Sequence, residues 1–327
     1  MTVEKINFKY KSSNEKSNLN AFLIRPMCEP KGIVQIIHGM AEYIERYNEF
    51  ANFLAENGYV VVGHDQLGHG ESVSSDDELG YFGENGNKHI IFDIDLLRKK
   101  IQSKYPDIPY YILGHSMGSF LLRQYLVEKT SNSGGDVKLL SEGLSGAIIM
   151  GTGWKPVWLL SLAQIICRMN SAMFGKRNRS EFIDKIALGA NNKRFEPAQT
   201  PNEWLSKNRE NVDKYTADKK CGFKFTVNGF YYMFTGMKIS HDIHRIKDIP
   251  SNIDLLFISG ADDPVGDFGE GVRKAYIKYK ENTECKTDIK LYLNDRHEIL
   301  NETDRDEVYK DILLWLEKRE IRNDMYI

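Results

Sequence analysis

Short apolar runs alternate with stretches of helical periodicity along much of the chain. Four of the runs lie at residues 33–37, 59–63, 110–113 and 146–150. Such a short apolar run is typical of a strand buried on both faces of a parallel sheet. Between the runs, apolar residues recur at helical spacing, as Tyr43, Tyr47 and Phe50 do. The alternation predicts right-handed strand–helix–strand units in a mostly parallel α/β sheet with helices on both faces.

The same pattern divides the chain. Further strands are expected at 3–10, 19–25, 253–259 and 288–293, and further helices at 90–101, 119–129, 269–280 and 304–318. The rhythm stops after residue 153, and the sequence up to residue 246 is more helical and irregular, without a buried-strand run. We therefore expect one α/β core formed by residues 1–153 and 247–327, interrupted by a mainly helical lid at residues 154–246. Residues 131–135 are expected to form a short flexible loop.

Composition narrows the class of protein. The chain has 327 residues, of which 41% are hydrophobic and 11% aromatic, enough for a large core and too apolar for a wholly disordered chain. Lys and Arg number 44 against 46 Asp and Glu, which argues against a nucleic-acid binder. The first ten residues carry charges where a signal peptide needs an apolar run, and no stretch approaches the ~20 apolar residues of a membrane span. We expect a cytoplasmic protein, with four reduced, mostly buried cysteines whose wide spacing predicts no metal site: Cys28, Cys167, Cys221 and Cys285.

The first chemical motif lies between a predicted strand and a predicted helix. Residues 113–118 read Leu-Gly-His-Ser-Met-Gly and match the pattern G-x-S-x-G. In that context the serine sits on a strained strand-to-helix turn, and the flanking glycines allow the close packing that the turn requires. The helix N-terminus then directs backbone N–H groups toward a developing oxyanion. The motif therefore predicts Ser116 as a nucleophile.

A serine nucleophile needs a base, and the base needs a carboxylate that orients it. Enzymes with this turn place the acid and then the histidine after the serine in the chain. Of the eight histidines only His297 lies beyond residue 253, in a short loop after a predicted strand. The loop after the preceding strand holds Asp262 and Asp263. We favour Asp263, because Pro264 and Val265 fix the turn that directs it inward, and Asp262 stays the alternative.

An oxyanion hole needs two backbone donors. One is expected from Met117, directly after the nucleophile, and the other from Met40, in the loop after the strand at 33–37. His38 in that loop is interpreted as a packed loop residue rather than a catalytic one. The histidine-rich and glycine-rich segment 63–72 is interpreted as structural, because its residues lack the tight spacing of metal ligands.

With these residues assembled, the chain resembles the α/β-hydrolase superfamily, and within it the serine aminopeptidase S33 or Hydrolase-4 group, which includes monoacylglycerol lipases and lysophospholipase-like proteins. The matching segments, in the family's order, are HGMAEYIERY (38–47), GHDQLGHGES (63–72), LGHSMGS (113–119), SGADDPVG (259–266) and RHEILNE (296–302). The resemblance implies Ser116 as nucleophile, His297 as base and Asp263 as acid. It also implies Met40 and Met117 as oxyanion donors, and a lid after residue 153.

The expected lid holds an apolar stretch at 156–170. A helix there has one side on the core, and the other faces a substrate, a partner or a membrane surface unless the whole helix is buried. At ~15 residues it is too short to span a bilayer. The candidates for substrate contact are Trp158, Leu159, Leu162 and Ile166. An aromatic patch at 223–234 belongs either to an acyl pocket or to core packing.

We therefore expect a serine carboxylic-ester hydrolase that acts on a monoacyl lipid, such as a monoacylglycerol or a lysophospholipid, without a metal or organic cofactor. Transient membrane contact through the lid fits this expectation, and the oligomeric state stays open. An aminopeptidase or amidase is the alternative, and it needs a lid carboxylate to bind the substrate's amine. The candidates are Glu181, Asp184, Glu203 and Asp213. A non-catalytic binding protein on the same fold is a third reading, against which the intact triad argues.

Overall fold

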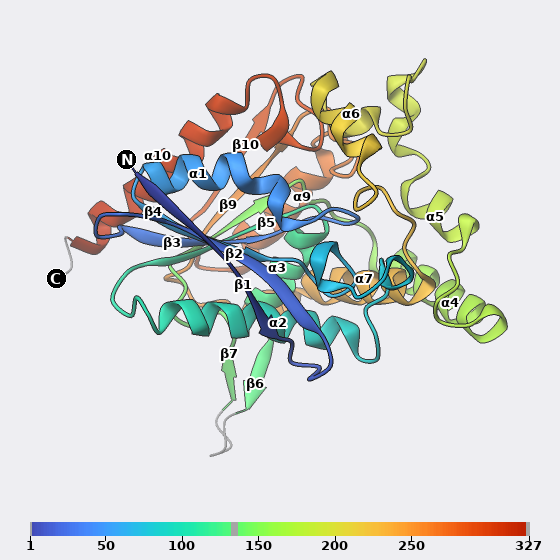
Figure 1. Cartoon of the computed structure of the whole chain (residues 1–327), viewed down its shortest axis with the longest axis horizontal. Coiled ribbons are helices and arrows are strands. Elements are labelled where there is room, and N and C mark those ends of the chain that lie inside the picture. Colours follow the sequence, from blue (N-terminus) through green and yellow to red (C-terminus); the bar gives the residue numbers. More distant parts are fainter. Residues whose placement is uncertain (1, 132–136, 325–327) are drawn as a thin grey trace.

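A twisted eight-stranded sheet runs through the middle of the molecule, seen in a computed structural model that describes residues 2–131 and 137–324 (Figure 1). The strand order is β1-β2-β4-β3-β5-β8-β9-β10. The strands are β1 (Val3–Lys11), β2 (Asn18–Pro26), β3 (Gly32–Ile37), β4 (Tyr59–His64), β5 (Tyr110–His115), β8 (Gly146–Met150), β9 (Asp254–Gly260) and β10 (Thr287–Tyr292). Two short strands, β6 (Lys129–Ser131) and β7 (Val137–Leu139), form a separate ribbon. The expected loop at 131–135 therefore begins in a strand, and its remaining residues lie outside the described part.

The sheet is parallel from β4 to β10, and only β1 and β2 run antiparallel to their neighbours. Every residue of β3, β4, β5 and β8 is buried, which is why these strands read as continuous apolar runs. The predicted α/β fold class is confirmed. Because the parallel strands share one direction, the loops after β3, β5, β8, β9 and β10 meet at one edge of the sheet.

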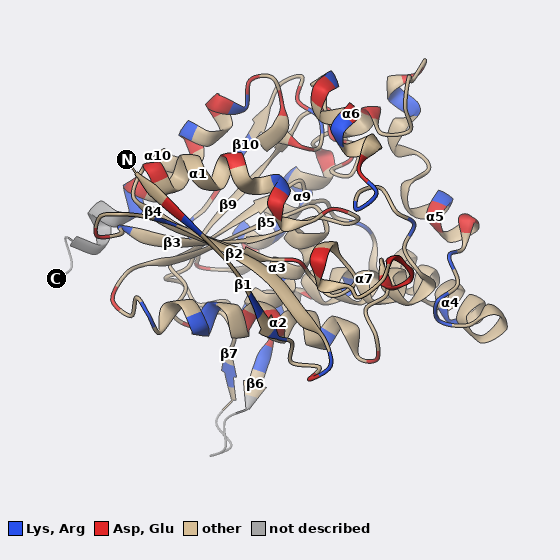
Figure 2. Ribbon diagram, viewed as in Figure 1, with Lys and Arg blue, Asp and Glu red and all other residues tan. Residues whose placement is uncertain are grey.

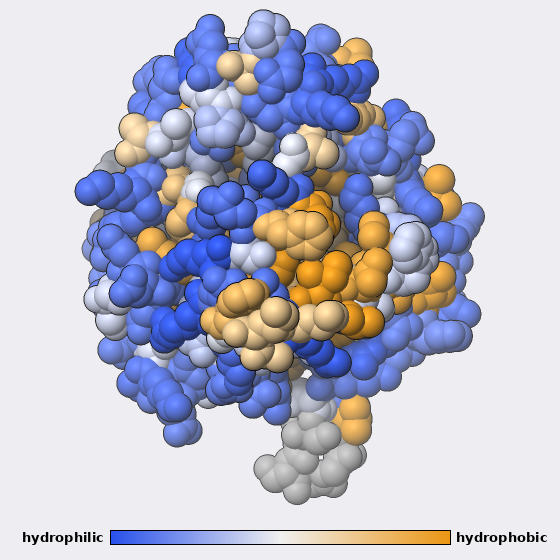
Figure 3. All heavy atoms as spheres, turned by 90° about the vertical axis from the view of Figure 1, so that its right-hand side faces the viewer, coloured by the Kyte–Doolittle hydropathy of each residue, from blue (hydrophilic) through white to orange (hydrophobic). Residues whose placement is uncertain are grey.

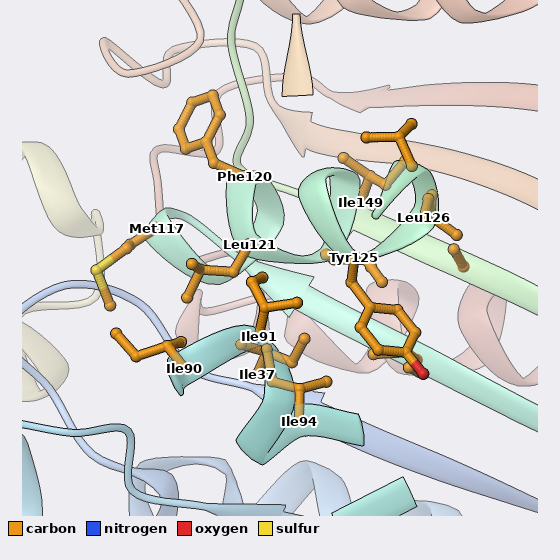
Figure 4. Close-up of a cluster of buried hydrophobic side chains, with 14 of the residues drawn as sticks. Ile37, Ile90, Ile91, Ile94, Met117, Phe120, Leu121, Tyr125, Leu126 and Ile149 are labelled. Atoms are coloured by element: carbon orange, nitrogen blue, oxygen red, sulfur yellow. The ribbon is translucent and has the colours of Figure 1, made fainter. Parts of the chain in front are cut away.

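Helices cover both faces of the sheet. The core helices are α1 (Asn48–Glu56), α2 (Gly86–Gln102), α3 (Met117–Val127), α9 (Glu270–Asn282) and α10 (Arg305–Asp324). Side chains of α1 and α10 pack into one apolar layer, and those of α2, α3 and α9 into the other. Figure 4 shows the second layer, where Ile90, Ile91 and Ile94 of α2 lie close to Leu121 and Tyr125 of α3. Short 3-10 helices are η1 (Ile44–Tyr47), η2 (Gly70–Ser72), η3 (Asp76–Glu78), η4 (Asn191–Phe195), η5 (Glu203–Leu205) and η6 (Ile299–Asn301).

Residues 154–246, called the helical segment below, follow the carboxyl end of β8 and contain helices but no strand. Its α-helices are α4 (Val157–Phe174), α5 (Glu181–Leu188), α6 (Arg209–Ala217), α7 (Val227–Ser240) and α8 (Ile243–Ile246). Helix α7 packs against both α3 and α4, and α4 contacts α5 at the right-hand side of Figure 1, whereas α6 lies nearer the top.

Helix α4 corrects one expectation. It has 18 residues and is, within the described residues, the one helix long and apolar enough to cross a membrane by length and composition. The helix continues past Asn170 through Ser171-Ala172-Met173-Phe174, so the argument that it is too short to span was wrong. Its packing against α7 shows that one side belongs to the folded protein.

Candidate active site

Ser116 occupies the sharp turn between β5 and α3. Its backbone has φ 52° and ψ −121°, a strained conformation for a residue with a side chain. A Cβ added to Gly114 would lie 2.3 Å from the Gly118 carbonyl oxygen, and one added to Gly118 would lie 2.1 Å from that of Ile37. Both flanking positions therefore need glycine, which is the physical reason for the two glycines of the G-x-S-x-G pattern. The helix begins at Met117, two residues earlier than predicted, because it starts directly after the strained serine.

Asp263 and His297 meet at the same edge of the sheet, in the loops after β9 and β10. The Asp263 Oδ2 lies 2.9 Å from the His297 Nδ1, at ion-pair distance, although the contact does not have the geometry of a hydrogen bond. The same carboxylate accepts hydrogen bonds from the Ser259 hydroxyl (2.9 Å) and the Val265 amide (2.8 Å). Burial alone raises the pKa of Asp263, but the neighbouring His297 and these two donors lower it below its ordinary value. Asp263 is thus held as a buried carboxylate against the imidazole.

Asp262, the alternative acid, has a different environment. Its amide donates to the Asp295 carbonyl at 2.9 Å, and within the described residues its carboxylate makes no ion pair with His297. Of the two neighbouring carboxylates the structure brings Asp263 to the histidine.

Two aromatic rings flank His297. The ring of His115 lies 4.8 Å from it and that of Trp204 lies 5.0 Å from it, centroid to centroid. The His297 amide donates to the Trp204 carbonyl at 3.4 Å, so η5 of the helical segment contacts the histidine loop directly. Gly151 leaves space on another side, because a Cβ there would lie 3.1 Å from the His297 Cε1. Trp204 belongs to no motif and was missed in the sequence.

The two amides predicted as oxyanion donors, those of Met40 and Met117, are unpaired in the described part of the chain. Met117 is the first residue of α3, and neither its amide nor that of Met40 has a hydrogen-bond acceptor among the described residues. The loop of Met40 lies against the nucleophile, since a Cβ added to Gly39 would be 3.1 Å from the Ser116 Cβ. Two unpaired backbone donors beside the serine are what an oxyanion hole requires.

A cluster of charged residues holds the loop that contains Gly39 and Met40. Glu42 accepts hydrogen bonds from the Gly39 amide (2.6 Å), Arg46 (2.6 Å) and the Tyr47 hydroxyl (2.7 Å). Arg46 also binds both carboxylate oxygens of Glu298, the residue after His297, at 2.7 Å. The Nδ1 of His115 lies 3.3 Å from the Glu42 carboxylate, and its Nε2 lies 3.2 Å from the His297 carbonyl oxygen.

These contacts set the charges of the cluster. Burial raises the pKa of Glu42, but His115 and Arg46 lower it below its ordinary value, and Arg46 does the same for Glu298. Burial lowers the pKa of His115, but the hydrogen bond and charge of Glu42 raise it above its ordinary value. A protonated His115 with Arg46 would balance the two carboxylates. The sequence motif 38–47 contained two of these residues, but nothing in it indicated their partners.

Comparisons with known proteins follow this geometry. Residues 28–304 match the family model described as "Serine aminopeptidase, S33", Hydrolase_4. The chain belongs to this family. It is 26% identical to a monoglyceride lipase homolog of monkeypox virus, over 90% of this chain and 92% of the viral one, and 23% identical to the monoglyceride lipase of Rattus norvegicus, over 90% and 85%.

Solved structures agree with that assignment. A thermostable carboxyl esterase from Bacillus coagulans, in complex with glycerol, superposes with a TM-score of 0.87 and 30% identity over 98% of this chain and 100% of the esterase. A soluble variant of the monoglyceride lipase from Saccharomyces cerevisiae, at 20% identity over 98% and 96% of the two chains, superposes with a TM-score of 0.72 and shares the fold. This S33-family chain is a serine ester hydrolase.

His38 and the segment 63–72 of the hydrolase hold the neighbouring loops together. The His38 ring is buried, and its Nε2 accepts a hydrogen bond from the Gln66 amide at 2.9 Å. In the segment 63–72, Asp65 accepts from the amides of Ile44 and Glu71, both at 2.8 Å. The described part of the chain contains no group of three residues that could hold a metal ion. The structural interpretation of both segments agrees with these contacts.

The outward side of α4 gives the hydrolase an apolar face. Only Leu160 and Cys167 of this helix are buried. Of the four substrate-contact candidates, Trp158, Leu159 and Leu162 are exposed and Ile166 is partly buried against the core. Helix α4 carries one charged residue, Arg168, and it is almost entirely tan in Figure 2. Figure 3 looks onto this side of the molecule and shows apolar side chains gathered there.

The exposed apolar side chains of α4 and α5 are called the apolar face below. Those exposed by about two fifths or more are Val157, Trp158, Leu159, Leu162, Ile165, Met169, Met173, Phe174, Phe182 and Ile186.

The aromatic patch at 223–234 is mostly core. Phe225 and Phe230 are fully buried, and Phe234 is nearly so. Phe225 contacts the rings of Phe82 and His69, at centroid distances of 5.4 and 5.3 Å. Core packing is therefore the correct interpretation for these three phenylalanines, and α4 is left as the main apolar surface of the helical segment.

Proposed function

We propose that this hydrolase cleaves monoacyl lipid esters through an acyl-enzyme formed on Ser116. The observation that carries the proposal is the placement of the buried Asp263–His297 pair at the sheet edge that also bears the strained serine and two free amides. Each part matches a requirement of ester cleavage: a nucleophile, an oriented base and an oxyanion site.

The reaction follows from these roles. The Ser116 Oγ attacks the ester carbonyl while His297 accepts its proton, and Asp263 stabilises the resulting imidazolium. The amides of Met40 and Met117 bind the oxyanion. His297 then protonates the departing alcohol, which leaves an acyl-enzyme, and a water activated by the same histidine releases the fatty acid. No step uses a metal or an organic cofactor.

The monoacyl lipid is proposed from the apolar face and from the relatives. An acyl chain needs an apolar surface beside the nucleophile, and the helical segment that carries the apolar face also reaches His297 through Trp204. The rat relative is named a monoglyceride lipase and the viral one a monoglyceride lipase homolog, and the Bacillus coagulans esterase structure holds glycerol. We propose that residues 154–246 form a lid over Ser116, and that the apolar face touches a membrane surface transiently.

An aminopeptidase is the second candidate, because the family model carries that description. It needs a lid carboxylate free to bind an amine. Glu181 is paired with Lys224, and Glu203 and Asp213 are both paired with Arg209. Asp184 has no such partner among the described residues, and burial raises its pKa above the ordinary value. The pairing of three of these four carboxylates favours an ester over an amino-acid amide.

One hydrolysis panel tests the proposal. The purified chain is assayed on p-nitrophenyl esters of graded length, monoacylglycerols, lysophospholipids and amino-acid arylamides. We expect Ser116→Ala to lose at least ~10⁴-fold in kcat on esters and to lose labelling by a fluorophosphonate probe. Asp263→Asn is expected to lose ~10⁴-fold, whereas the neighbouring control Asp262→Asn changes kcat less than about threefold.

Three outcomes of the panel would overturn parts of the proposal. Ester hydrolysis that survives in Ser116→Ala removes the acyl-enzyme on that residue. Faster release from arylamides than from esters supports the aminopeptidase instead. A wild-type chain that neither hydrolyses any substrate nor reacts with the probe is a binding protein.

A further inference from the structure

Arg123 is a buried cation on the helix that begins at the nucleophile. It lies on α3, seven residues after Ser116, and its side chain is fully buried. Within the described residues it has no carboxylate partner at ion-pair distance, unlike the partly buried Arg46 and the buried Arg319. Placing an unpaired charge in the interior is costly, so a residue of this kind needs several well-placed acceptors.

The acceptors of Arg123 lie at both ends of the helical segment. Its Nη1 donates to the Thr152 hydroxyl (3.2 Å) and the Gly153 carbonyl (3.0 Å), directly before the segment starts. Its Nη2 donates to the carbonyl of Ser240, the last residue of α7, at 3.2 Å. One guanidinium therefore holds two stretches of chain that are almost ninety residues apart in sequence.

Tyr279 and the rings of Trp154 and His241 add further contacts at the place where Arg123 holds the two stretches of chain. The Tyr279 hydroxyl of α9 accepts from the Arg123 Nε (3.2 Å) and donates to the same Ser240 carbonyl (3.1 Å). The guanidinium lies 5.2 Å from the Trp154 ring, which is itself 4.2 Å from the ring of His241. The residues that follow Thr152 and Ser240 are thus packed against each other as well as against Arg123.

We propose that Arg123 is a positioning residue for the substrate: it fixes both connections of the helical segment to the nucleophile helix. The planar fork of a guanidinium can bind both connections at once, whereas an ammonium group cannot reach the same set in that geometry. The segment's substrate-binding surface then keeps a constant place relative to Ser116. The inference rests on the proposed function in one respect, that the segment binds the acyl chain.

The test compares Arg123→Met with Arg98→Met. Arg98 is another buried arginine; it donates to the Tyr125 hydroxyl and to the carbonyls of Leu140 and Glu142, none of which belongs to the helical segment. Both variants are assayed on p-nitrophenyl dodecanoate and p-nitrophenyl acetate. For Arg123→Met we expect KM for the long ester to rise about tenfold while kcat/KM for acetate stays within about twofold, a split that general destabilisation would not produce.

Hydrogen exchange gives a readout that does not depend on activity. We expect amides at residues 150–156 and 236–246 to exchange about tenfold faster in Arg123→Met and at the wild-type rate in Arg98→Met. If Arg123→Met does not fold, Tyr279→Phe replaces it; that variant removes one acceptor of Arg123 and one donor to Ser240, and a KM increase of about threefold is expected.

The outcomes separate the two proposals. An unchanged ratio of long-ester to short-ester KM, or an equal change in Arg98→Met, overturns the role of Arg123. Equal loss on both esters also overturns it, because the defect then lies in the nucleophile turn. If the wild-type chain hydrolyses neither ester, the proposed function fails, and the exchange rates still decide whether Arg123 holds the two connections.

Discussion

Glu42 joins the loop after β3, the turn at Ser116 and, through Arg46, the loop of His297. Its carboxylate holds the Gly39 amide next to Met40, pairs with Arg46, and contacts His115, the residue before the nucleophile. These contacts are buried, apart from the partly buried pair with Arg46, so removing the charge leaves donors without an acceptor. Breaking a buried pair in this way costs about 3–5 kcal/mol of unfolding free energy.

The pH dependence of that cost follows from the two pKa shifts. The pKa of Glu42 is lowered from 4.5, so its pairing stabilises the fold above that pH and is lost as pH falls through the folded value. The pKa of His115 is raised from 6.5, so its contribution is complete below that pH and is lost as pH rises through the folded value. Both contributions are present between about pH 4.5 and 6.5.

We therefore predict that Glu42→Gln loses about 3 kcal/mol of unfolding free energy near pH 6 and clearly less near pH 9, measured by urea denaturation. Glu45→Gln is the control, because Glu45 forms a more exposed pair with Lys5, and it should cost less than about 1 kcal/mol. An equal loss for Glu42→Gln at both pH values would show that His115 is not charged by Glu42.

At the scale of elements, the loop after β3 must lie close to α3 for the site to work. A Cβ on Gly39 would lie 2.5 Å from the Glu42 carboxylate and 3.1 Å from the Ser116 Cβ, so the loop would have to move away. Moving it carries the Met40 amide with it. We predict that Gly39→Ala lowers kcat on a short ester about 100-fold, the effect of losing one oxyanion donor.

The thermal stability of Gly39→Ala distinguishes a loss of catalysis from a loss of the folded state. Its melting temperature should fall by only a few degrees, because the loop can shift without opening the core. Gly83→Ala is the control: Gly83, unlike Gly39, has a positive φ, so alanine strains the backbone there, but its added Cβ would meet nothing within 4 Å. Wild-type kcat in Gly39→Ala would mean that Met40 is not an oxyanion donor.

A strand or a site residue can be predicted from the sequence when its cause lies in neighbouring residues. A contact between residues far apart in the chain cannot. The buried strands were predictable because burial on both faces leaves a continuous apolar run, as in β4 and β5. Ser116 and His297 were predictable because chain order and turn chemistry identify them. The Arg46–Glu298 pair joins residues 252 positions apart, and Trp204 reaches His297 through an irregular stretch, so only the fold could show either contact.

At the scale of the whole molecule, net charge and exposed apolar surface together determine how the protein would contact a lipid surface. The formal charge is −2, and the charged residues lie over most of the chain but are rare on α4 (Figure 2). A molecule with so little net charge gains little from the field of a charged membrane. Contact with a lipid surface would therefore depend on the apolar face, whose side chains gather on one side (Figure 3).

The low net charge and the apolar face together predict that lipid binding depends little on salt. Partitioning onto neutral phosphatidylcholine vesicles, measured by co-sedimentation, should change less than about twofold between about 0.05 M and about 0.5 M salt. The double variant Trp158→Gln/Ile165→Gln should lose about tenfold or more, because each change removes a large exposed apolar side chain from α4. Ile277→Gln/Leu314→Gln removes exposed apolar side chains from α9 and α10 instead and should bind as the wild type does.

The vesicle experiment distinguishes binding through the apolar face from binding through charged residues or through general apolar exposure. Binding that falls steeply with salt would assign the contact to charged residues, and equal losses in both double variants would assign it to general apolar exposure. Neither substitution touches Ser116, Asp263 or His297, so hydrolysis of a short dissolved ester should stay at the wild-type rate. Loss of activity on vesicle-borne monoacylglycerol alone would then place α4 between the membrane and the active site.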